Sequence, residues 1–284
     1  MPEKAPTAVA IHDLSAVGRC SAAVVLPVLS AMGIQCCPLP TAYLSAHSGF
    51  PKSDKAVFLD LTPQMAGTIH HWQELGLAFD AVYSGFLGAA EQVDLLCGYL
   101  DGLEPRRPYI LVDPVMGDRG MAYTSCPPGL RDRMAQLARR AHCITPNLTE
   151  AAFLLGESYD RRPAERQGVE DWLLRLSLGG RRSVVLTGVS FREGEVGAAC
   201  YDSGDGSVHF PMARQTDAHF GGTGDLFASV LLGGVLRGEA LSAAAARAVA
   251  FVAQAVSYTL TLGTPTAHGV CFEPLLGQLI PPAG

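Results

Sequence analysis

Charged residues are scarce in this chain of 284 residues: they make up 17% of it, against about 25% in an average soluble domain. The hydrophobic class reaches 48%, which is enough to bury a large core and excludes an intrinsically disordered protein. A basic excess is also lacking, because 21 Lys and Arg stand against 27 Asp and Glu, for a formal net charge of −6. A negative field repels phosphate backbones, and we therefore expect no nucleic-acid partner.

Segments with the composition of a membrane anchor or a targeting signal are lacking as well. No run approaches the roughly 18 apolar residues of a membrane-spanning helix. The richest stretch, residues 243–262, is interrupted by Arg247, Gln254 and several hydroxyl side chains. The first apolar segment, residues 8–11, is far too short for the core of a signal peptide. We expect a cytoplasmic protein that has no membrane partner.

The eight cysteines lack the spacing of metal or redox sites. They stand at positions 20, 36, 37, 97, 126, 143, 200 and 271, without a C-x-x-C pair or a Cys/His set of zinc spacing. Most lie in apolar runs, where we expect them to be small buried residues. The adjacent Cys36 and Cys37 leave a redox role open.

Apolar runs alternate with segments of helical period along most of the chain. The runs that predict strands are residues 8–11, 35–39, 81–84, 109–113, 143–145 and 183–187. The segments that predict helices are residues 21–32, 89–103, 129–138, 148–155 and 169–178. This alternation predicts an α/β protein with a doubly wound, mostly parallel central sheet and helices on both faces.

The pattern changes after residue 187. Residues 197–201 and 207–211 flank a cluster of turn residues and predict an antiparallel ribbon at the edge of the sheet. Two helices rich in Ala, Leu and Val follow at residues 223–237 and 242–260, and we expect both to be buried. No repeat and no convincing linker divides the chain, so we expect one domain over residues 1–284.

A glycine-rich turn opens the first of these two helices. Residues 219–227 read H-F-G-G-T-G-D-L-F, where glycines permit positive φ angles and close backbone approach. The free N–H groups of a first helical turn bind anions such as a phosphoryl group. Asp225 beside that site has two interpretations: it takes a proton from an attacking hydroxyl, or it only caps the helix. The turn is not a Walker A motif, because no G-K-[S/T] follows.

Acidic residues follow the strand predicted at 109–113. Residues 112–118 read V-D-P-V-M-G-D, and ligands of open α/β sheets lie outside the carboxyl ends of the strands. Asp113 and Asp118 are therefore placed where a metal and nucleotide phosphates would lie. A solvated acidic turn is the alternative for Asp118.

Hard-oxygen side chains follow the next predicted strand. Residues 145–150 read T-P-N-L-T-E, and Asn147 and Glu150 are one helical turn apart. They can face one Mg²⁺ or its water molecules. They could equally form a capping box that starts at Asn147.

These motifs together resemble the ribokinase-like superfamily, and specifically its vitamin B6 branch, the pyridoxal kinases. The resemblance rests on D-P-V-M-G at 113–117, T-P-N-x-x-E at 145–150 and G-T-G-D at 222–225. T-A-Y-L-S-A-H-S-G at 41–49 is similar to the loop of that family that faces pyridoxal, and S-G-F-L-G at 84–88 is similar to its S-G-Y-L-G. All five segments occur in the family's order and span most of the chain.

The resemblance implies roles on the phosphate side of the site. Asp225 would be the general base for the 5′-hydroxymethyl group of the acceptor, inside an anion hole made by Gly222, Thr223 and Gly224. Asn147 and Glu150 would organise Mg²⁺ directly or through water. The metal, a monovalent cation or the triphosphate would lie near Asp113, Thr145 and Thr187, whereas ATP would be bordered by Asp118 and Phe220. No P-loop lysine is present, so positive charge must come from Mg²⁺, from K⁺ as a candidate, from backbone dipoles or from an arginine such as Arg119.

On the acceptor side, the resemblance implies contacts with the pyridine ring or its substituents. The residues concerned are His12, Thr41, His47, Ser48, Phe86 and Tyr123. One departure bears on the vitamer: the first strand of these kinases commonly ends in Ser-His, with the serine at the pyridine end, whereas here Ile11-His12 is followed by Asp13. Asp13, Ser15 or His12 could substitute, which leaves open the choice among pyridoxal, pyridoxamine and pyridoxine.

The predicted function is ATP-dependent phosphorylation of the 5′-hydroxymethyl group of a B6 vitamer. A hydroxymethylpyrimidine kinase is the alternative, although those kinases usually carry G-T-G-C where this chain has Asp225 in G-T-G-D. A non-catalytic B6-binding protein is the second alternative. The expected ligands are ATP, Mg²⁺ and the vitamer, with K⁺ as a candidate, and a homodimer is what the family implies.

Overall fold

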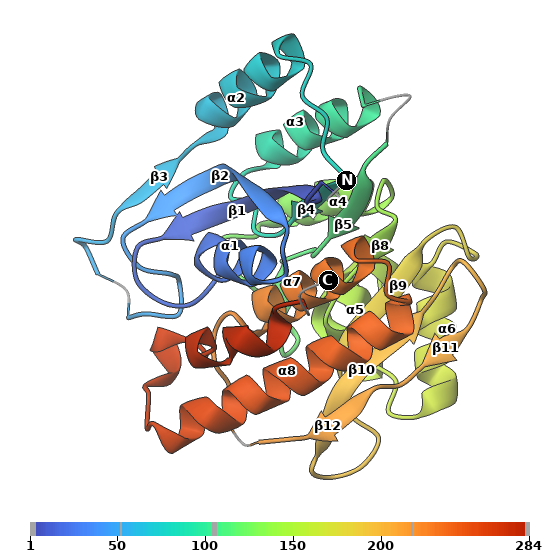
Figure 1. Ribbon diagram of the computed structural model, residues 1–284. Coiled ribbons are helices and arrows are strands. Elements are labelled where there is room, and N and C mark those ends of the chain that lie inside the picture. The colour runs from blue at the N-terminus through green and yellow to red at the C-terminus, as the bar shows by residue number, and fades with distance from the viewer. Residues whose placement is uncertain (1–3, 52, 104–106, 217, 282–284) are drawn as a thin grey trace.

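The chain forms one ten-stranded sheet and a separate short hairpin. The computed structural model describes residues 4–51, 53–103, 107–216 and 218–281. The strands of the sheet are β1 (Thr7–Ser15), β2 (Gln35–Leu44), β3 (Phe58–Asp60), β4 (Ala81–Ser84), β5 (Tyr109–Val112), β8 (Cys143–Ile144), β9 (Ser183–Val189), β10 (Glu195–Tyr201), β11 (Val208–His209) and β12 (Met212–Arg214). Their order is β11-β10-β9-β8-β5-β4-β1-β2-β3, with β12 paired to β10 (Figure 1). The hairpin consists of β6 (Gly117–Asp118) and β7 (Met121–Ala122).

The six central strands, from β2 to β9, run parallel. The strands outside them are antiparallel: β3 pairs with β2 at one edge, and β10 pairs with β9, β11 and β12 at the other. The mostly parallel sheet and its antiparallel edge ribbon are therefore confirmed. The single domain stays a prediction, which the continuity of this sheet favours.

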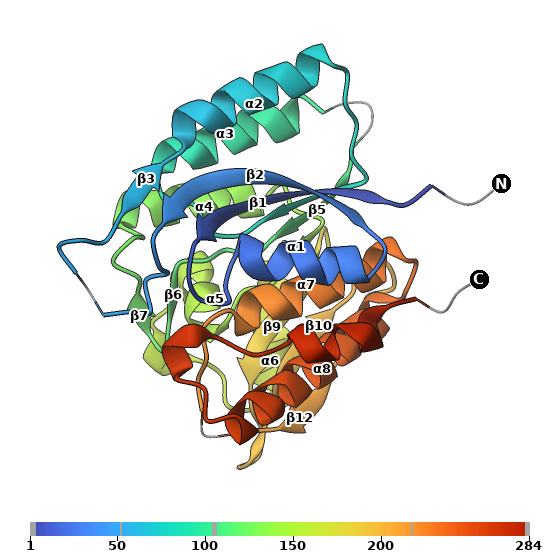
Figure 2. The same ribbon diagram turned by 60° about the vertical axis from the view of Figure 1, so that its left-hand side comes forward.

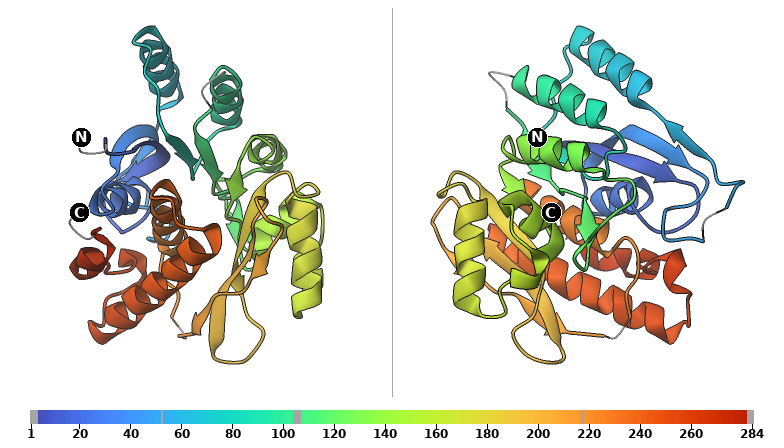
Figure 3. Two further views of the ribbon diagram at one scale, coloured as in Figure 1. Left: turned by 45° about the vertical axis from the view of Figure 1, so that its right-hand side comes forward. Right: turned by 180° about the vertical axis from the view of Figure 1, so that it is seen from behind.

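Helices cover both faces of the sheet (Figure 3). The α-helices are α1 (Ala22–Ala31), α2 (Thr62–Glu74), α3 (Ala90–Asp101), α4 (Pro128–Ala138), α5 (Leu148–Leu155), α6 (Arg166–Leu176), α7 (Thr223–Leu236) and α8 (Leu241–Thr261). The 3₁₀ helices are η1 (Tyr159–Arg161), η2 (Thr266–His268) and η3 (Glu273–Leu279). Helices α1, α7 and α8 share one core with the sheet, and α2 to α6 share the other.

Alternation along β1 shows why the central strands appear as unbroken apolar runs. Ala8 and Ala10 belong to the core under α1 and α7, whereas Val9 and Ile11 belong to the opposite core. A strand covered on both faces needs apolar side chains at every position, because successive residues point to opposite sides.

The sequence did not predict α2 or β3. Only Met65 and Ile69 of α2 are buried, so its apolar period is too sparse to identify a helix. All three residues of β3 are exposed. A weakly buried segment carries little hydrophobic pattern from which an element can be predicted.

The prediction that both C-terminal helices are buried is right for α7 and wrong for one face of α8. Among the described residues, α8 is the one helix long and apolar enough to cross a membrane by length and composition. It packs along α7 and the β10–β12 ribbon, and its outer face carries Arg247, Gln254 and Ser257. That face also carries several alanines, which favour helix at exposed positions.

The carboxyl ends of the parallel strands form the edge on which the candidate site lies. In Figure 2 both described ends of the chain lie at the opposite edge, beside the start of β1. The β6–β7 hairpin and the start of α7 lie at the carboxyl edge (Figure 2).

Candidate active site

Four parallel strands end side by side at this edge. Three backbone hydrogen bonds continue the ladder at the strand ends. The Gly85 N–H donates to the carbonyl of Ile11 at 3.0 Å. The Asp113 N–H donates to the carbonyl of Ser84 at 2.8 Å, and the Thr145 N–H to that of Val112 at 3.1 Å. The pairing of β1 with β2 shifts between His12 and Leu14, and such an irregularity changes the direction in which nearby side chains point. The predicted residues at these strand ends are therefore neighbours.

The glycine-rich turn packs its backbone tightly against the start of α1. Gly222 has φ 77°, and a Cβ at this position would overlap the carbonyl oxygen of Arg19. Helix α7 begins at Thr223 without a side-chain cap. Its first-turn N–H groups thus keep the capacity to bind an anion. A Cβ at Gly224 would lie 3.8 Å from Oδ2 of Asp113, so the end of β5 faces this turn.

Asp225 lies in the first turn of α7 and is held by the backbone. Its Oδ2 accepts a 2.7 Å hydrogen bond from the N–H of Ser21. Burial raises the pKa of Asp225 to about 7, the Ser21 N–H opposes that rise, and the charge of Asp13 adds to it. A carboxylate with a pKa near neutrality can take up a proton at physiological pH, as a general base must.

Ser21 is a site residue that the sequence did not reveal. It has φ 50° and ψ −133°, although it is not glycine, and its side chain makes no capping hydrogen bond to α1. Such a conformation costs on the order of 1–3 kcal/mol and persists where its surroundings fix it. Here the strained residue directs its N–H at Asp225. A serine before a helix is an ordinary capping signal, so the sequence gives no sign of this contact.

Asp113 is buried and Asp225 is mostly buried, and the two acids are close enough for their charges to interact. Burial, followed by the charge of Asp225, raises the pKa of Asp113 to about 8, and the Thr145 hydroxyl opposes this rise. Neither carboxylate is stabilised by a lysine or arginine at this edge of the described chain. Within the described residues, no group of three or more His, Cys, Asp or Glu side chains could hold a metal ion. The residues nevertheless fit Mg²⁺, which binds through one or two carboxylates together with phosphates and water.

Asn147 and Glu150 form the capping box of α5. Oδ1 of Asn147 accepts the N–H of Glu150 at 3.0 Å, and Oε2 of Glu150 accepts the N–H of Asn147 at 2.9 Å. Glu150 also accepts the N–H of Met116 at 3.0 Å, while Asn147 Nδ2 donates to Gly117 at 2.8 Å. Burial, and then the charge of Asp113, raises the pKa of Glu150 well above its ordinary value. These bonds fix the segment after Asp113, and the role of both side chains at Mg²⁺ stays a prediction.

The β6–β7 hairpin projects from this capping box. Its two turn residues, Arg119 and Gly120, have φ 51° and 80°, as a type I′ turn requires. The Gly120 N–H donates to Thr149 Oγ1 at 2.9 Å, which ties the turn to α5. Asp118 is exposed and accepts the N–H of Arg119 at 2.9 Å. Burial, and then the charges of Glu150 and Asp118, raise the pKa of Tyr123, which places its phenol beside the hairpin.

His47 lies beside the glycine-rich turn in one defined tautomer. Its Nδ1 accepts the N–H of Gly49 at 3.0 Å, so Nε2 carries the proton and donates to the carbonyl of Ala267 at 2.6 Å. A Cβ at Gly221 would lie 3.2 Å from Cε1 of the ring. The segment 41–49, which begins in β2, and the glycine-rich turn are far apart in the sequence and meet at His47.

The other predicted ligand contacts differ in how they are placed. Thr41 donates to the carbonyl of Phe86 at 3.0 Å, which joins two of the predicted acceptor residues. Ser48 is exposed. Thr187 bridges to Asn147 in the backbone ladder, beside the predicted metal ligands. Phe220 is buried in the core under α7, so its contact with ATP rests on the resemblance alone.

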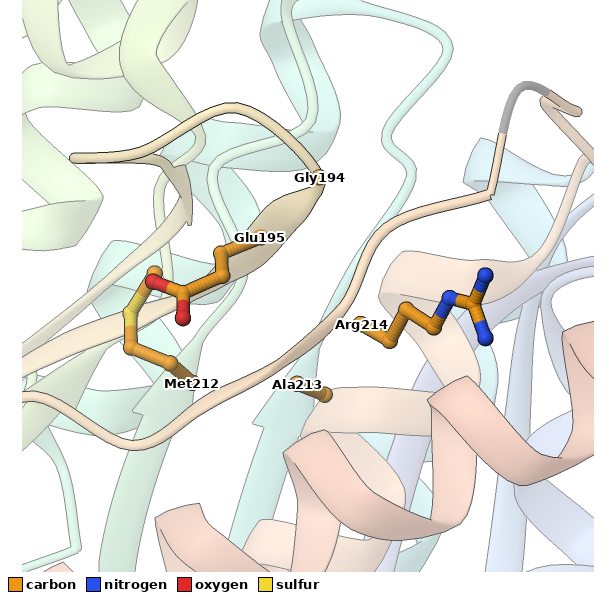
Figure 4. A pocket seen from close by; sticks show the side chains of 5 residues that line it. All are labelled: Gly194, Glu195, Met212, Ala213 and Arg214. Atoms are coloured by element: carbon orange, nitrogen blue, oxygen red, sulfur yellow. The ribbon is translucent and has the colours of Figure 1, made fainter.

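A cavity of about 330 Å³ lies elsewhere, between β10 and β12 (Figure 4). It is lined by Gly194, Glu195, Met212, Ala213 and Arg214. None of the predicted site residues contributes to it, and the side chains of Glu195 and Arg214 point away from each other in Figure 4. The candidate active site is therefore the carboxyl edge of the sheet and not this cavity.

Comparison with known proteins agrees with the fold and the motifs. The sequence profile of the phosphomethylpyrimidine kinase family matches residues 68–270. A protein from Bacteroides thetaiotaomicron with a provisional phosphomethylpyrimidine kinase name, crystallised with pyridoxal, is 35% identical, with a TM-score of 0.91 over 97% of this chain and 96% of that one. Pyridoxal kinase from Lactobacillus plantarum is 32% identical, with a TM-score of 0.87 over 97% of both chains.

A curated relative leads to the same family. The pyridoxine/pyridoxal/pyridoxamine kinase of Bordetella pertussis is 29% identical over 269 residues, which cover 90% of each chain. The chain belongs to the phosphomethylpyrimidine kinase family of ribokinase-like phosphotransferases, in the branch that includes the pyridoxal kinases.

Proposed function

We propose that this kinase transfers the γ-phosphoryl group of ATP to the 5′-hydroxymethyl group of pyridoxal or a related B6 vitamer. One observation carries the proposal. A buried carboxylate with its pKa raised to about 7, Asp225, lies in the helical turn whose N–H groups can bind the transferred phosphoryl group.

The residues divide the reaction between proton transfer and charge stabilisation. Asp225 takes the hydroxyl proton as the acceptor oxygen forms its bond to the γ-phosphorus and the bond from that phosphorus to the oxygen of ADP breaks. The backbone N–H groups of Gly222, Thr223 and Gly224 donate to the phosphoryl oxygens, where charge develops. The Ser21 N–H keeps Asp225 in place during the transfer.

The acidic side chains around the turn suit a metal site. Mg²⁺, when bound with ATP, would neutralise charge on the phosphate oxygens. Asp113 is the residue best placed to hold it, with Thr145 adjacent and with Asn147 and Glu150 acting through water. The pair of Asp113 and Asp225 supports this assignment, because nearby positive charge would let both ionise at neutral pH. A site for K⁺ near Asp113 and Thr187 is a further proposal, which rests on the resemblance.

The relatives support two candidate acceptors. The Bacteroides thetaiotaomicron protein with pyridoxal bound and the B6 kinase names of other relatives favour a vitamer. The phosphomethylpyrimidine kinase profile keeps hydroxymethylpyrimidine as the second candidate acceptor. A protein that only binds B6 has no need of a base such as Asp225, so this residue disfavours a non-catalytic binding protein.

A panel of acceptors separates these candidates. ADP release is measured with Mg-ATP and pyridoxal, pyridoxamine, pyridoxine or hydroxymethylpyrimidine, each at several concentrations. We expect the highest kcat/KM with a B6 vitamer. A higher kcat/KM with hydroxymethylpyrimidine would establish the second candidate, and binding of pyridoxal without ADP release would establish a binding protein.

We further propose a cytoplasmic homodimer. All eight cysteines are free and six of them are buried, which suits a reducing compartment. The homodimer rests on the resemblance, and the exposed apolar residues at the β3 edge, Val57, Phe58 and Leu59, offer a surface for it.

A further inference from the structure

His12 is a buried polar side chain that the mechanism above does not use. Its side chain is 0% exposed, and neither ring nitrogen has a hydrogen-bond partner among the described residues. Buried polar groups are almost always paired, so an unpaired imidazole next to an active site requires an explanation. The neighbouring Asp225 has 14% of its own side chain exposed.

The fold provides a specific niche for this ring. Tyr83 of β4 meets it edge to face, with the ring centroids 4.4 Å apart and the planes inclined by 74°. The backbone of Gly85 lies directly against the ring, so that a Cβ at this position would overlap Cε1 and Nδ1 of His12. Both neighbours restrict the ring to one place, with Nδ1 on the side of Asp225.

Nδ1 of His12 lies 3.7 Å from Oδ1 of Asp225. The other oxygen of that carboxylate, Oδ2, is already fixed by the N–H of Ser21 at 2.7 Å. A separation of 3.7 Å is longer than a hydrogen bond, and hydrogen bonds to catalytic groups often shorten only when substrate is bound. Because Tyr83 and Gly85 hold the ring, the movement that closes the gap would come from the Asp225 carboxyl group.

The titratable groups around His12 and Asp225 come from several elements. They are Asp13 of β1, Tyr83 of β4, Cys20 before α1 and Asp113 after β5, together with Asp225 itself. Burial lowers the pKa of His12 to about 3, so the ring is neutral at physiological pH. A neutral imidazole carries one N–H, which can be on Nδ1 or on Nε2.

We propose that His12 is a positioning residue for the catalytic base: its Nδ1–H donates to Oδ1 of Asp225 when the acceptor is bound. With Ser21 holding Oδ2 and His12 holding Oδ1, the carboxylate is fixed from two sides and keeps the orientation in which it receives the hydroxyl proton. This inference rests on the proposed function of Asp225 as a base.

Two substitutions of His12 separate positioning from packing. His12→Asn offers an amide N–H close to the place of Nδ1, whereas His12→Leu fills similar space without a donor. We expect His12→Leu to lower kcat about ten- to hundredfold, the range for a hydrogen bond to a charged group. We expect His12→Asn to retain kcat within about threefold, and the KM values of both substrates to change little in either variant.

Several results would overturn the proposal. These are a kcat of His12→Leu equal to that of the wild type, equal losses of kcat in both variants, and a change confined to KM. If Asp225→Asn keeps normal turnover, the proposed base itself is wrong, so that failure is distinguishable from the failure of His12 alone.

A second measurement does not depend on the folding of a variant without a donor. NMR of the wild-type protein labelled with nitrogen-15 histidine and saturated with pyridoxal, with His12 assigned by comparison with His12→Asn, reports which ring nitrogen carries the proton. We expect the neutral Nδ1–H tautomer. The neutral Nε2–H tautomer or a charged ring at neutral pH would contradict the proposal.

Discussion

Asp225 destabilises the fold at neutral pH, and replacing it by Asn should reveal by how much. Burial raises the pKa of this carboxyl from 3.8 to about 7. Each pH unit corresponds to 1.36 kcal/mol, so full ionisation in the folded protein costs up to about 4 kcal/mol. The Asn side chain carries no charge and is free of this cost.

Proton linkage determines whether the free energy of unfolding rises or falls with pH. Below pH 3.8 the carboxyl is protonated in both the folded and the unfolded chain, and it contributes no difference. Between that pH and about 7 the unfolded chain binds fewer protons than the folded one, so the free energy of unfolding falls as the pH rises. Above the folded pKa the full cost is present. Asp225→Asn should therefore gain stability over the wild type as the pH rises through this window.

Urea unfolding at pH 5 and pH 8, in the absence of Mg²⁺ and ATP, measures this difference. We expect Asp225→Asn to exceed the wild type by several kcal/mol at pH 8, and by clearly less at pH 5. Asp132→Asn, at an exposed position of α4, is the matched control and should show no such change. A stability difference that is independent of pH, or a variant less stable than the wild type at pH 8, would refute the free-energy cost assigned to ionising Asp225 in the folded protein.

Four other predictions concern the same site and the β3 edge. Ser21→Gly removes a side chain from a residue at φ 50°, so it should raise the free energy of unfolding by about 1 kcal/mol in urea titrations while kcat stays near that of the wild type; a large loss of kcat would contradict this. Gly222→Ala places a Cβ against the Arg19 carbonyl at φ 77°, and steady-state assays should show kcat at least about tenfold lower. The kcat/KM for the acceptor should fall tenfold per pH unit below about 7, as Asp225 becomes protonated, and a flat profile down to pH 5 would exclude this base. Leu59→Arg should shift the light-scattering mass from dimer towards monomer, whereas an unchanged dimer would remove β3 from the interface.

The parallel strands of the core could be predicted because they are unbroken apolar runs in the sequence. The strand at 81–84 was predicted with its observed bounds, since every residue of β4 is buried. Helix α5 was also predicted with its observed bounds, because its capping box starts at Asn147 and its last turn is followed by Gly156 in the left-handed conformation. Helix α2 and strand β3 lack a clear apolar pattern, because few of their residues are buried.

Site residues could be predicted from the sequence only where a short local motif indicates their chemistry. The glycines before α7 indicate an anion site, whereas Asp225 by itself leaves a base and a helix cap as alternatives. The strain at Ser21 and the burial of His12 beside Asp225 depend on which segments meet in three dimensions, and no local pattern encodes them. Glu150 shows a third case: its motif predicts either a capping box or a metal site. The capping box is present, and the metal role stays a prediction.

The most direct test of the proposed chemistry is the rate of pyridoxal phosphorylation by Asp225→Asn compared with the wild type, under saturating Mg-ATP and pyridoxal. Formation of the 5′-phosphate ester is followed together with ADP release, and the binding of ATP is measured separately. We expect a loss of at least about a hundredfold in kcat with ATP binding largely kept. Turnover near that of the wild type in this variant would show that Asp225 is not the base.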